Sequence, residues 1–244
     1  MRNGDPAEAS VAATDTGRDP AGSRAAGRSR TARGSADGRV ARGNETRRLV
    51  LRHAVAVASV EGLDGLTVGR LAGDLGLSKS GVFALFGSKE DLQLATVRFA
   101  IRVFLEHVVH PADELPHGID RLWRLCTGWL AYSQRRIFPG GCFFYAVAAE
   151  YDARPGRLHD TIAAARRNWF SFLEQALREA QRTGQARADV DGAQLVFELC
   201  ALMELANGES VLHGDDTGYR LAARGILTRL RAAAADPSLL PSEA

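Results

Sequence analysis

Cysteine, lysine and long apolar runs are all scarce in this chain of 244 residues. Its three cysteines, Cys126, Cys142 and Cys200, are too few and too widely spaced for a disulfide framework or a zinc knuckle. The longest apolar stretch, residues 140–149, has about half of the ~20 residues that a membrane-spanning helix needs. The N-terminus lacks the apolar segment of a usual secretory signal. These absences predict a soluble, cytoplasmic protein.

Net charge is nearly absent as well, because 31 Lys and Arg residues face 29 Asp and Glu residues and leave a formal charge of +2. No global field therefore favours a polyanionic partner. Lys79 and Lys89 are the only lysines, and all the other basic residues are arginines. The arginine excess carries no functional meaning by itself, since genome composition produces the same bias.

Residues 1–44 contain almost nothing that a protein core would bury. Val11 and Val40 are their only branched aliphatic residues, and they include no aromatic residue. Such a segment cannot offset the entropy lost when the chain is ordered. Eight arginines and five acidic residues lie between Arg2 and Arg42. We expect a disordered, weakly basic tail, which is either an inert extension or an arm that tracks DNA.

The remainder of the chain predicts helices. Apolar residues recur with the spacing of a helix face, and no run alternates with the period of a strand. The sequence therefore predicts an all-α protein, with a break enforced after residue 110 by Pro111 and Pro116. The expected helices cover residues 46–61, 67–75, 78–85, 88–110, 117–136, 142–152, 157–182, 193–213 and 217–235.

Residues 62–92 carry the most informative pattern. Thr67 is a favourable N-cap for a short helix, and Gly76 follows where a helix end favours a left-handed residue. Ser78 then caps a second short helix, residues 78–85. Two short helices joined by a glycine-containing turn form a helix-turn-helix unit, whose second helix enters the major groove of DNA. The candidate DNA contacts are Thr67, Arg70, Ser78, Lys79, Ser80, Gly81, Phe83 and Lys89.

This stretch resembles the DNA-binding domain of the TetR/AcrR family of transcriptional regulators. The residues that carry the resemblance are Gly62, Thr67-Val68, Leu71-Ala72, Gly76-Leu77-Ser78, Phe83, Phe86, Ser88-Lys89-Glu90 and Leu92. The resemblance covers residues 48–92, and the later helices match in architecture only. It implies a homodimer that binds double-stranded DNA and whose C-terminal helices bind a small-molecule effector that controls DNA affinity.

Two residues depart from the family pattern. The family usually has Tyr where this chain has Phe83, which cannot donate a hydrogen bond to a phosphate. Gly81 lies inside the second helix, where glycine costs about 1 kcal/mol of helix propensity. That glycine either allows a close approach of the backbone to DNA or is tolerated drift.

The expected domains follow from these observations. Residues 1–44 are the tail, residues 45–92 the helix-turn-helix domain, residues 93–235 a helical domain for ligand binding and dimerisation, and residues 236–244 a C-terminal tail. The helical domain has more aromatic side chains than a thin helical layer needs, so we expect an apolar pocket rather than core packing alone. The candidate pocket residues are Phe104, His107, Trp123, Cys126, Trp129, Phe144, Trp169 and Phe172.

Residues 193–206 are apolar around nearly the whole helix and are interrupted only by Gln194, Glu198 and Glu204. A helix of this kind has two buried sides, one of which faces the core and the other a second subunit. The candidate interface residues are Leu195, Leu199, Leu202, Tyr219 and Leu227.

Several residues allow a second interpretation. His107, His110 and His117 suggest a metal site, but no convincing fourth ligand accompanies them, so we expect solvated histidines and no metal or other cofactor. Glu150 is either a polar group inside the pocket or an exposed carboxylate. Cys142 is expected to pack as a small apolar residue rather than act as a redox switch.

The sequence therefore predicts a DNA-binding regulator and not an enzyme. The expected mechanism is that of a repressor released from a palindromic operator by a small apolar or aromatic molecule. One alternative is a helical DNA-binding or architectural protein without an effector. The other is a helical enzyme or carrier, although no nucleophile-and-base pair supports it.

Overall fold

The computed structural model describes the backbone of residues 29–244 and the side chains from residue 40 onward. Residues 43–244 form one compact unit, and residues 1–42 are assigned to another. The described residues contain no β-strand, only a single antiparallel bridge between Ala186 and Ala234, so the all-α prediction is confirmed. No helix among them is long and apolar enough to cross a membrane.

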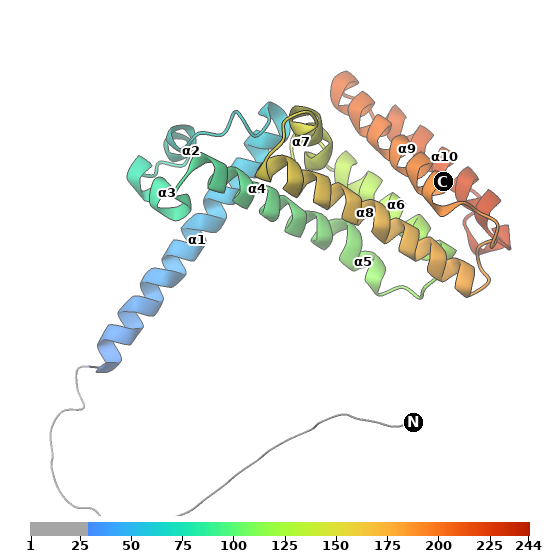
Figure 1. The fold of residues 1–244 in the computed structure, drawn as a ribbon, viewed down its shortest axis with the longest axis horizontal. Helices are drawn as coiled ribbons and strands as arrows, with labels where there is room; N and C mark the ends of the chain where they lie inside the picture. The colour runs from blue at the N-terminus through green and yellow to red at the C-terminus, as the bar shows by residue number, and fades with distance from the viewer. Residues whose placement is uncertain (1–28) are drawn as a thin grey trace, which may run out of the picture. The chain divides into compact units, whose positions relative to one another are not determined.

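The order of helices agrees closely with the sequence pattern (Figure 1). The N-terminal group is α1 (Ser29–Glu61), α2 (Val68–Asp74) and α3 (Lys79–Phe86). The helices that follow are α4 (Lys89–Phe104), α5 (His110–Asp113), α6 (Ile119–Gln134), α7 (Phe143–Tyr151), α8 (Arg157–Arg182), α9 (Gly192–His213) and α10 (Thr217–Ala233).

The segment expected to be a flexible tail is partly helical. Helix α1 begins at Ser29, within the segment expected to be a disordered tail, and residues 1–28 lie outside the described part of the chain. None of residues 40–49 is buried, and burial begins at Val50. Once the packed half of a helix exists, each added residue gains a backbone hydrogen bond without a new nucleation cost.

Side-chain caps begin the short helices where the sequence predicts them. The Thr67 hydroxyl accepts a hydrogen bond from the Arg70 amide at 3.1 Å, and the Ser78 hydroxyl accepts one from the Gly81 amide at 3.1 Å. Gly76, in the turn between α2 and α3, has a φ of +63°. These local interactions fix the helix-turn-helix geometry.

The helix predicted for residues 88–110 is longer and less regular than expected. After α4 the chain makes a π-helical turn, Leu105–Val109, and continues into α5 as far as Asp113. The predicted break is present, but it begins after Asp113 rather than directly after residue 110. Pro111 lies in the first turn of α5, directly after the widened π turn, where a missing amide donor is tolerated.

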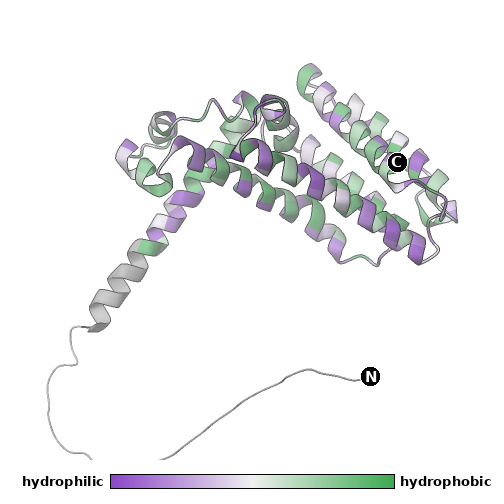
Figure 2. Ribbon diagram, viewed as in Figure 1, coloured by the Kyte–Doolittle hydropathy of each residue, from purple (hydrophilic) through white to green (hydrophobic). Residues whose placement is uncertain are grey.

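One hydrophobic core extends through residues 50–240 and includes side chains from the helix-turn-helix region and from the C-terminal helices. Figure 2 shows hydrophobic residues along much of α9, whereas the C-terminal end of α8 is hydrophilic. The segment predicted as a C-terminal tail is not entirely free. Residues Pro237–Leu239 form a 3₁₀ turn, and Leu240 is buried because the chain folds back onto the helices at that point.

Candidate DNA-binding surface and internal cavity

Helix α3 is anchored at its C-terminal end and open at its N-terminal end. Val82 and Phe86 are buried in the core, and the Arg47 guanidinium lies 4.5 Å from the centre of the Phe86 ring. Arg47 also donates a hydrogen bond to the Leu85 carbonyl at 2.7 Å, which satisfies one of the carbonyls at the end of the helix. The helix is therefore held from α1 while its first turn faces outward.

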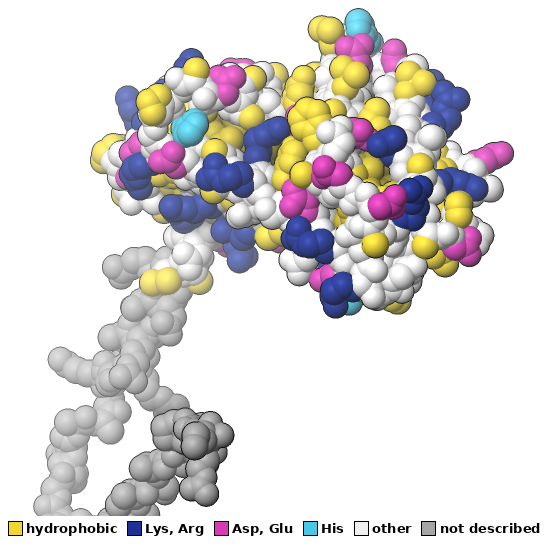
Figure 3. All heavy atoms as spheres, turned by 45° about the vertical axis from the view of Figure 1, so that its right-hand side comes forward, with side chains coloured by type: hydrophobic (Ala, Val, Ile, Leu, Met, Phe, Trp, Pro, Cys, Tyr) yellow, Lys and Arg dark blue, Asp and Glu magenta, His cyan; other side chains and the backbone are white. Residues whose placement is uncertain are grey.

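The exposed face of α3 carries the residues predicted to contact DNA. Lys79, Ser80 and Gly81 are exposed, and the large Phe83 ring is 54% exposed. The Lys79 side chain passes over the first turn of α2, since a Cβ at Gly69 would lie 3.7 Å from the Lys79 Cε. The first turns of α2 and α3, capped by Thr67 and Ser78, are thus side by side. Figure 3 shows Lys and Arg side chains on the lobe that carries these two helices.

Two of the predicted contacts are already occupied by partners within the protein. Arg70 forms an ion pair with Glu61 and lies 3.7 Å from Asp74, and Lys89 donates to the Asp64 carbonyl at 2.9 Å. The hydrogen bond from Arg70 holds the pKa of Glu61 below its ordinary value. A phosphate would have to compete with these groups. Of the three predicted cations, Lys79 alone forms no ion pair or hydrogen bond with another described residue, and its side chain is exposed.

A cavity of about 320 Å³ lies among helices α4, α6, α7, α8 and α9. Five of the eight predicted pocket residues line it, namely Phe104, Trp129, Phe144, Trp169 and Phe172. Most of the remaining wall is also apolar, which is the usual character of a small-molecule site.

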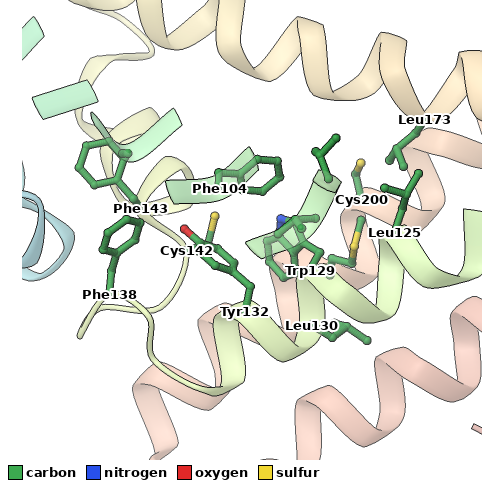
Figure 4. Packing of buried hydrophobic residues seen from close by; sticks show 14 of the residues in the cluster. Phe104, Leu125, Trp129, Leu130, Tyr132, Phe138, Cys142, Phe143, Leu173 and Cys200 are labelled. Carbon is green, nitrogen blue, oxygen red and sulfur yellow. The ribbon is translucent and has the colours of Figure 1, made fainter. Parts of the chain in front are cut away.

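The aromatic rings of the cavity are arranged around Phe104. Its ring centre is 5.1 Å from that of Trp169 and 6.0 Å from that of Phe144, in both cases edge to face. Figure 4 shows Phe104, Trp129 and Tyr132 close together, with Cys142 beside the Tyr132 hydroxyl. Residues from separate helices thus meet in one apolar cluster, and this packing supports the walls of the cavity.

Three of the predicted pocket residues do not reach the cavity. Trp123 and Cys126 are buried at 7% and 0% exposure, but neither side chain lines the cavity. His107 is exposed, and its Nδ1 atom lies 2.9 Å from the carbonyl oxygen of Val103. The π turn changes which residues face inward, because Leu105 and Val109 line the cavity in its place. Regular helical spacing could not predict that rotation.

The cavity also has a charged wall that the sequence analysis missed. Arg166 on α8 and Glu204 on α9 line it and form an ion pair at 2.7 Å, with each side chain about a third exposed. The signal for Glu204 was present, since it interrupts an otherwise apolar helix. Its partner lies 38 residues earlier in the chain and could not be assigned from spacing.

Glu150 occupies neither of the two places considered for it. Its carboxylate accepts hydrogen bonds from the backbone amides of Leu63 at 2.7 Å and Asp64 at 2.8 Å, in the turn between α1 and α2. The residue is half-buried and does not line the cavity. It connects α7 directly to the helix-turn-helix domain.

The thiols behave as small apolar groups. Burial raises the pKa of Cys142 to about 11 and that of Cys200 to about 12, so both are protonated near neutral pH. Within the described residues, no group of three or more His, Cys, Asp or Glu side chains is arranged to hold a metal ion.

The outer face of α9 is apolar and uncovered in the single chain. Phe197 and Leu205 are each 62% exposed, Leu212 is 75% exposed, and Leu221 on α10 is 54% exposed. We call these four residues the outer apolar face. Such a set of large exposed side chains is typical of an interaction surface.

Most of the residues predicted for a subunit interface face the other way. Leu195, Leu199, Tyr219 and Leu227 are at most 5% exposed and pack inside the single chain, so they offer almost no surface to a second subunit. Leu202 is half-buried, and its side chain lies close to Gly225. Because α9 is apolar on both sides, the sequence pattern could not tell its core side from its outer side.

Two family models match the chain. One, described as "Bacterial regulatory proteins, tetR family", matches residues 50–96, and the other, "Tetracyclin repressor-like, C-terminal domain", matches residues 118–226. No curated protein matches the sequence.

Solved structures share the fold. A TetR transcriptional regulator from Chloroflexus aurantiacus J-10-FL has 25% sequence identity and a TM-score of 0.74, over 79% of this chain and 98% of the other. A transcriptional regulator from Saccharomonospora viridis in complex with choline has 20% identity and a TM-score of 0.67, over 78% of this chain and 98% of the other. AibR in complex with isovaleryl coenzyme A and operator DNA has 19% identity and a TM-score of 0.59, over 74% of this chain and 95% of the other.

Proposed function

The chain belongs to the TetR family of transcriptional regulators, and from this premise we propose that it is a repressor released from its operator by an apolar or aromatic molecule. The observation that carries the proposal is the presence, in one compact unit, of an outward-facing helix-turn-helix and a separate apolar cavity. Two structural neighbours were solved with small molecules, choline and isovaleryl coenzyme A, and one of them also with operator DNA. Those complexes support a regulator that responds to a ligand.

The DNA complex is proposed to be that of a homodimer. Two chains that meet through the outer apolar face would present two copies of α3 to one side of the DNA. Dimeric helix-turn-helix proteins read half-sites about 34–36 Å apart, or a multiple of this distance. Selection from random DNA is therefore expected to return a palindrome. A selection that enriches no sequence, or only single half-sites, would contradict the proposal.

Replacing Lys79 with alanine is expected to weaken operator binding and to lower the salt dependence. If Lys79 neutralises one phosphate, the slope of log affinity against log salt falls by about one unit. If it reads a base, discrimination falls at one position of the site by about 1–3 kcal/mol. Binding isotherms at several salt concentrations separate the two results.

Lys79→Arg is the matched control for this substitution, because it keeps the charge at the first turn of α3. It is expected to retain the wild-type salt slope. Equal affinity, slope and sequence preference in Lys79→Ala and the wild type would remove Lys79 from the DNA interface.

A further inference from the structure

The turn between α1 and α2 is held by a carboxylate from α7. Each oxygen of Glu150 accepts one backbone hydrogen bond, from Leu63 at 2.7 Å and from Asp64 at 2.8 Å. Gly62 has a φ of +78°, and a Cβ at that position would lie 2.6 Å from the Glu150 Oε2. A side chain at position 62 would have to push the Glu150 carboxylate aside, and the positive φ also favours glycine there. We call these two hydrogen bonds the Glu150 clamp.

Neighbouring residues reinforce the clamp from the same end of α7. Asp64 accepts hydrogen bonds from the Tyr151 hydroxyl at 3.0 Å and from Arg154 at 2.6 Å. These donors hold the pKa of Asp64 below its ordinary value, so it is ionised at neutral pH. Three residues further along the chain, Thr67 caps the first helix of the helix-turn-helix. The clamp therefore acts at the entry to the DNA-binding unit.

The opposite end of α7 borders the cavity. Phe144 lies in its first turn and Cys142 directly precedes it, and both line the cavity wall. The Cys142 amide donates to the Asn207 side-chain oxygen at 2.8 Å, and the Ser133 hydroxyl donates to the same oxygen at 2.6 Å. Asn207 is buried on α9. The N-terminal end of α7 is thus anchored to α9 and α6, beside the place where a ligand would sit.

We propose that Glu150 is a positioning residue through which occupancy of the cavity changes the placement of the helix-turn-helix. Helix α7 is a rigid element of nine residues, about 13 Å long, anchored at Asn207 and clamped at the α1–α2 turn. A ligand that displaces Phe144 tilts the helix about its anchor and draws the carboxylate away from the two amides. Charge-assisted hydrogen bonds are shorter and stronger than neutral ones, so lengthening these two bonds weakens the main link between the α7 carboxylate and the turn. The inference rests on the proposed function.

Helix α4 offers a different route between the same two regions, and the two routes make different predictions. Phe104 on α4 lines the cavity, and Leu92 near its other end is buried in the core beside the helix-turn-helix. That route depends on apolar packing and does not require the Glu150 carboxylate. A change confined to the carboxylate therefore tests the α7 route alone.

The first variant is Glu150→Gln. Glutamine keeps the size of the side chain but turns an NH₂ group toward one of the two amide donors, so one hydrogen bond is lost. Hydrogen exchange at the Leu63 and Asp64 amides is expected to accelerate, and affinity for a DNA site selected with the wild type is expected to fall. The matched control is Asp152→Asn, which removes the same charge at an exposed position at the end of α7. It is expected to leave both measurements unchanged.

The second variant imitates a ligand without requiring its identity. Ala165 lines the cavity from α8, and Ala165→Phe places a phenyl ring inside it. With a coupling of typical size, this substitution is expected to weaken operator binding about 5- to 150-fold in the wild-type background. In the Glu150→Gln background the further loss is expected to be smaller, because one of the two hydrogen bonds of the clamp is already missing. Ala165→Leu replaces it if the phenylalanine variant does not fold.

The outcomes distinguish this inference from the proposed function. If filling the cavity weakens DNA binding equally with and without Glu150, the regulator responds to its cavity by another route and the inference is wrong. If Glu150→Gln accelerates exchange at the two amides but leaves DNA affinity unchanged, the clamp is structural only. If filling the cavity has no effect on DNA binding in the wild-type background, the ligand response itself fails, and the inference fails with it.

Discussion

Replacing Leu205 with glutamate is expected to give a folded monomer that has lost tight operator binding. Leu205 is 62% exposed in the single chain, so the new charge stays hydrated and leaves the core of the protomer intact. In a dimer formed through the outer apolar face, the same charge would be buried without a partner, which is strongly unfavourable. Linked binding to two half-sites contributes roughly 10²- to 10⁴-fold to affinity, and a monomer loses that contribution.

The experiment combines sedimentation with DNA binding by the same samples. Leu239→Glu is the matched control, since Leu239 is also exposed, at 42%, but lies in the 3₁₀ turn after α10. We expect the control to remain a dimer and to bind normally. A Leu205→Glu protein that is still dimeric, or a monomer that still binds the operator tightly, would show that the outer apolar face is not the dimer interface. Leu202 is less suitable because it is half-buried against Gly225, so a charge there would also disturb the fold.

Gly140→Ala is expected to destabilise the fold strongly. A Cβ at this position would overlap the carbonyl oxygen of Ser59 and lie 3.2 Å from the amide nitrogen of Val60. Both are backbone atoms of α1, which cannot rotate away as a side chain does. The Gly140 amide also donates to the Ser59 hydroxyl at 3.1 Å, and this hydrogen bond holds the loop close to α1. Overpacking of this kind costs about 1–3 kcal/mol and occasionally more.

Gly73→Ala provides the matched control, because it adds the same methyl group where no atom outside the neighbouring backbone of its own helix lies within 4 Å. Gly73 is inside α2, so alanine there is expected to stabilise the protein by roughly 0.5–1 kcal/mol. Urea unfolding of the two variants is therefore expected to shift in opposite directions. Equal stability of Gly140→Ala and the wild type would mean that the turn before α7 does not pack against α1 as described.

The features that the sequence predicted correctly are those that depend on interactions between residues close together in the chain. Thr67 and Ser78 each accept a hydrogen bond from an amide three residues ahead, so the start of α2 and of α3 depends only on neighbouring residues. Gly76 adopts a positive φ for a similarly local reason. The aromatic lining was predicted in part, because Phe104, Trp129 and Trp169 lie on the apolar faces of amphipathic helices.

The features that escaped prediction depend on residues far apart in the chain. Glu150 accepts a hydrogen bond from Leu63, which lies 87 residues earlier in the sequence. Its role therefore depends on a distant turn and cannot be inferred from the residues next to it in the chain. The ion pair of Arg166 with Glu204 has the same origin. The outer side of α9 could not be identified because both sides of that helix are apolar, and only the packing of α10 and α6 shows which side is already covered.

Occupancy of the cavity and binding of the operator are expected to weaken each other. Trp129 and Trp169 line the cavity and report its occupancy by fluorescence, while anisotropy of a labelled operator reports DNA binding in the same titration. With an aromatic compound identified by its effect on tryptophan emission, we expect both signals to change over one concentration range. A saturating concentration of operator is expected to lower the affinity for the compound by the same factor by which the compound lowers the affinity for the operator. A compound that saturates the tryptophan signal while operator affinity stays constant would show that the cavity does not control DNA binding.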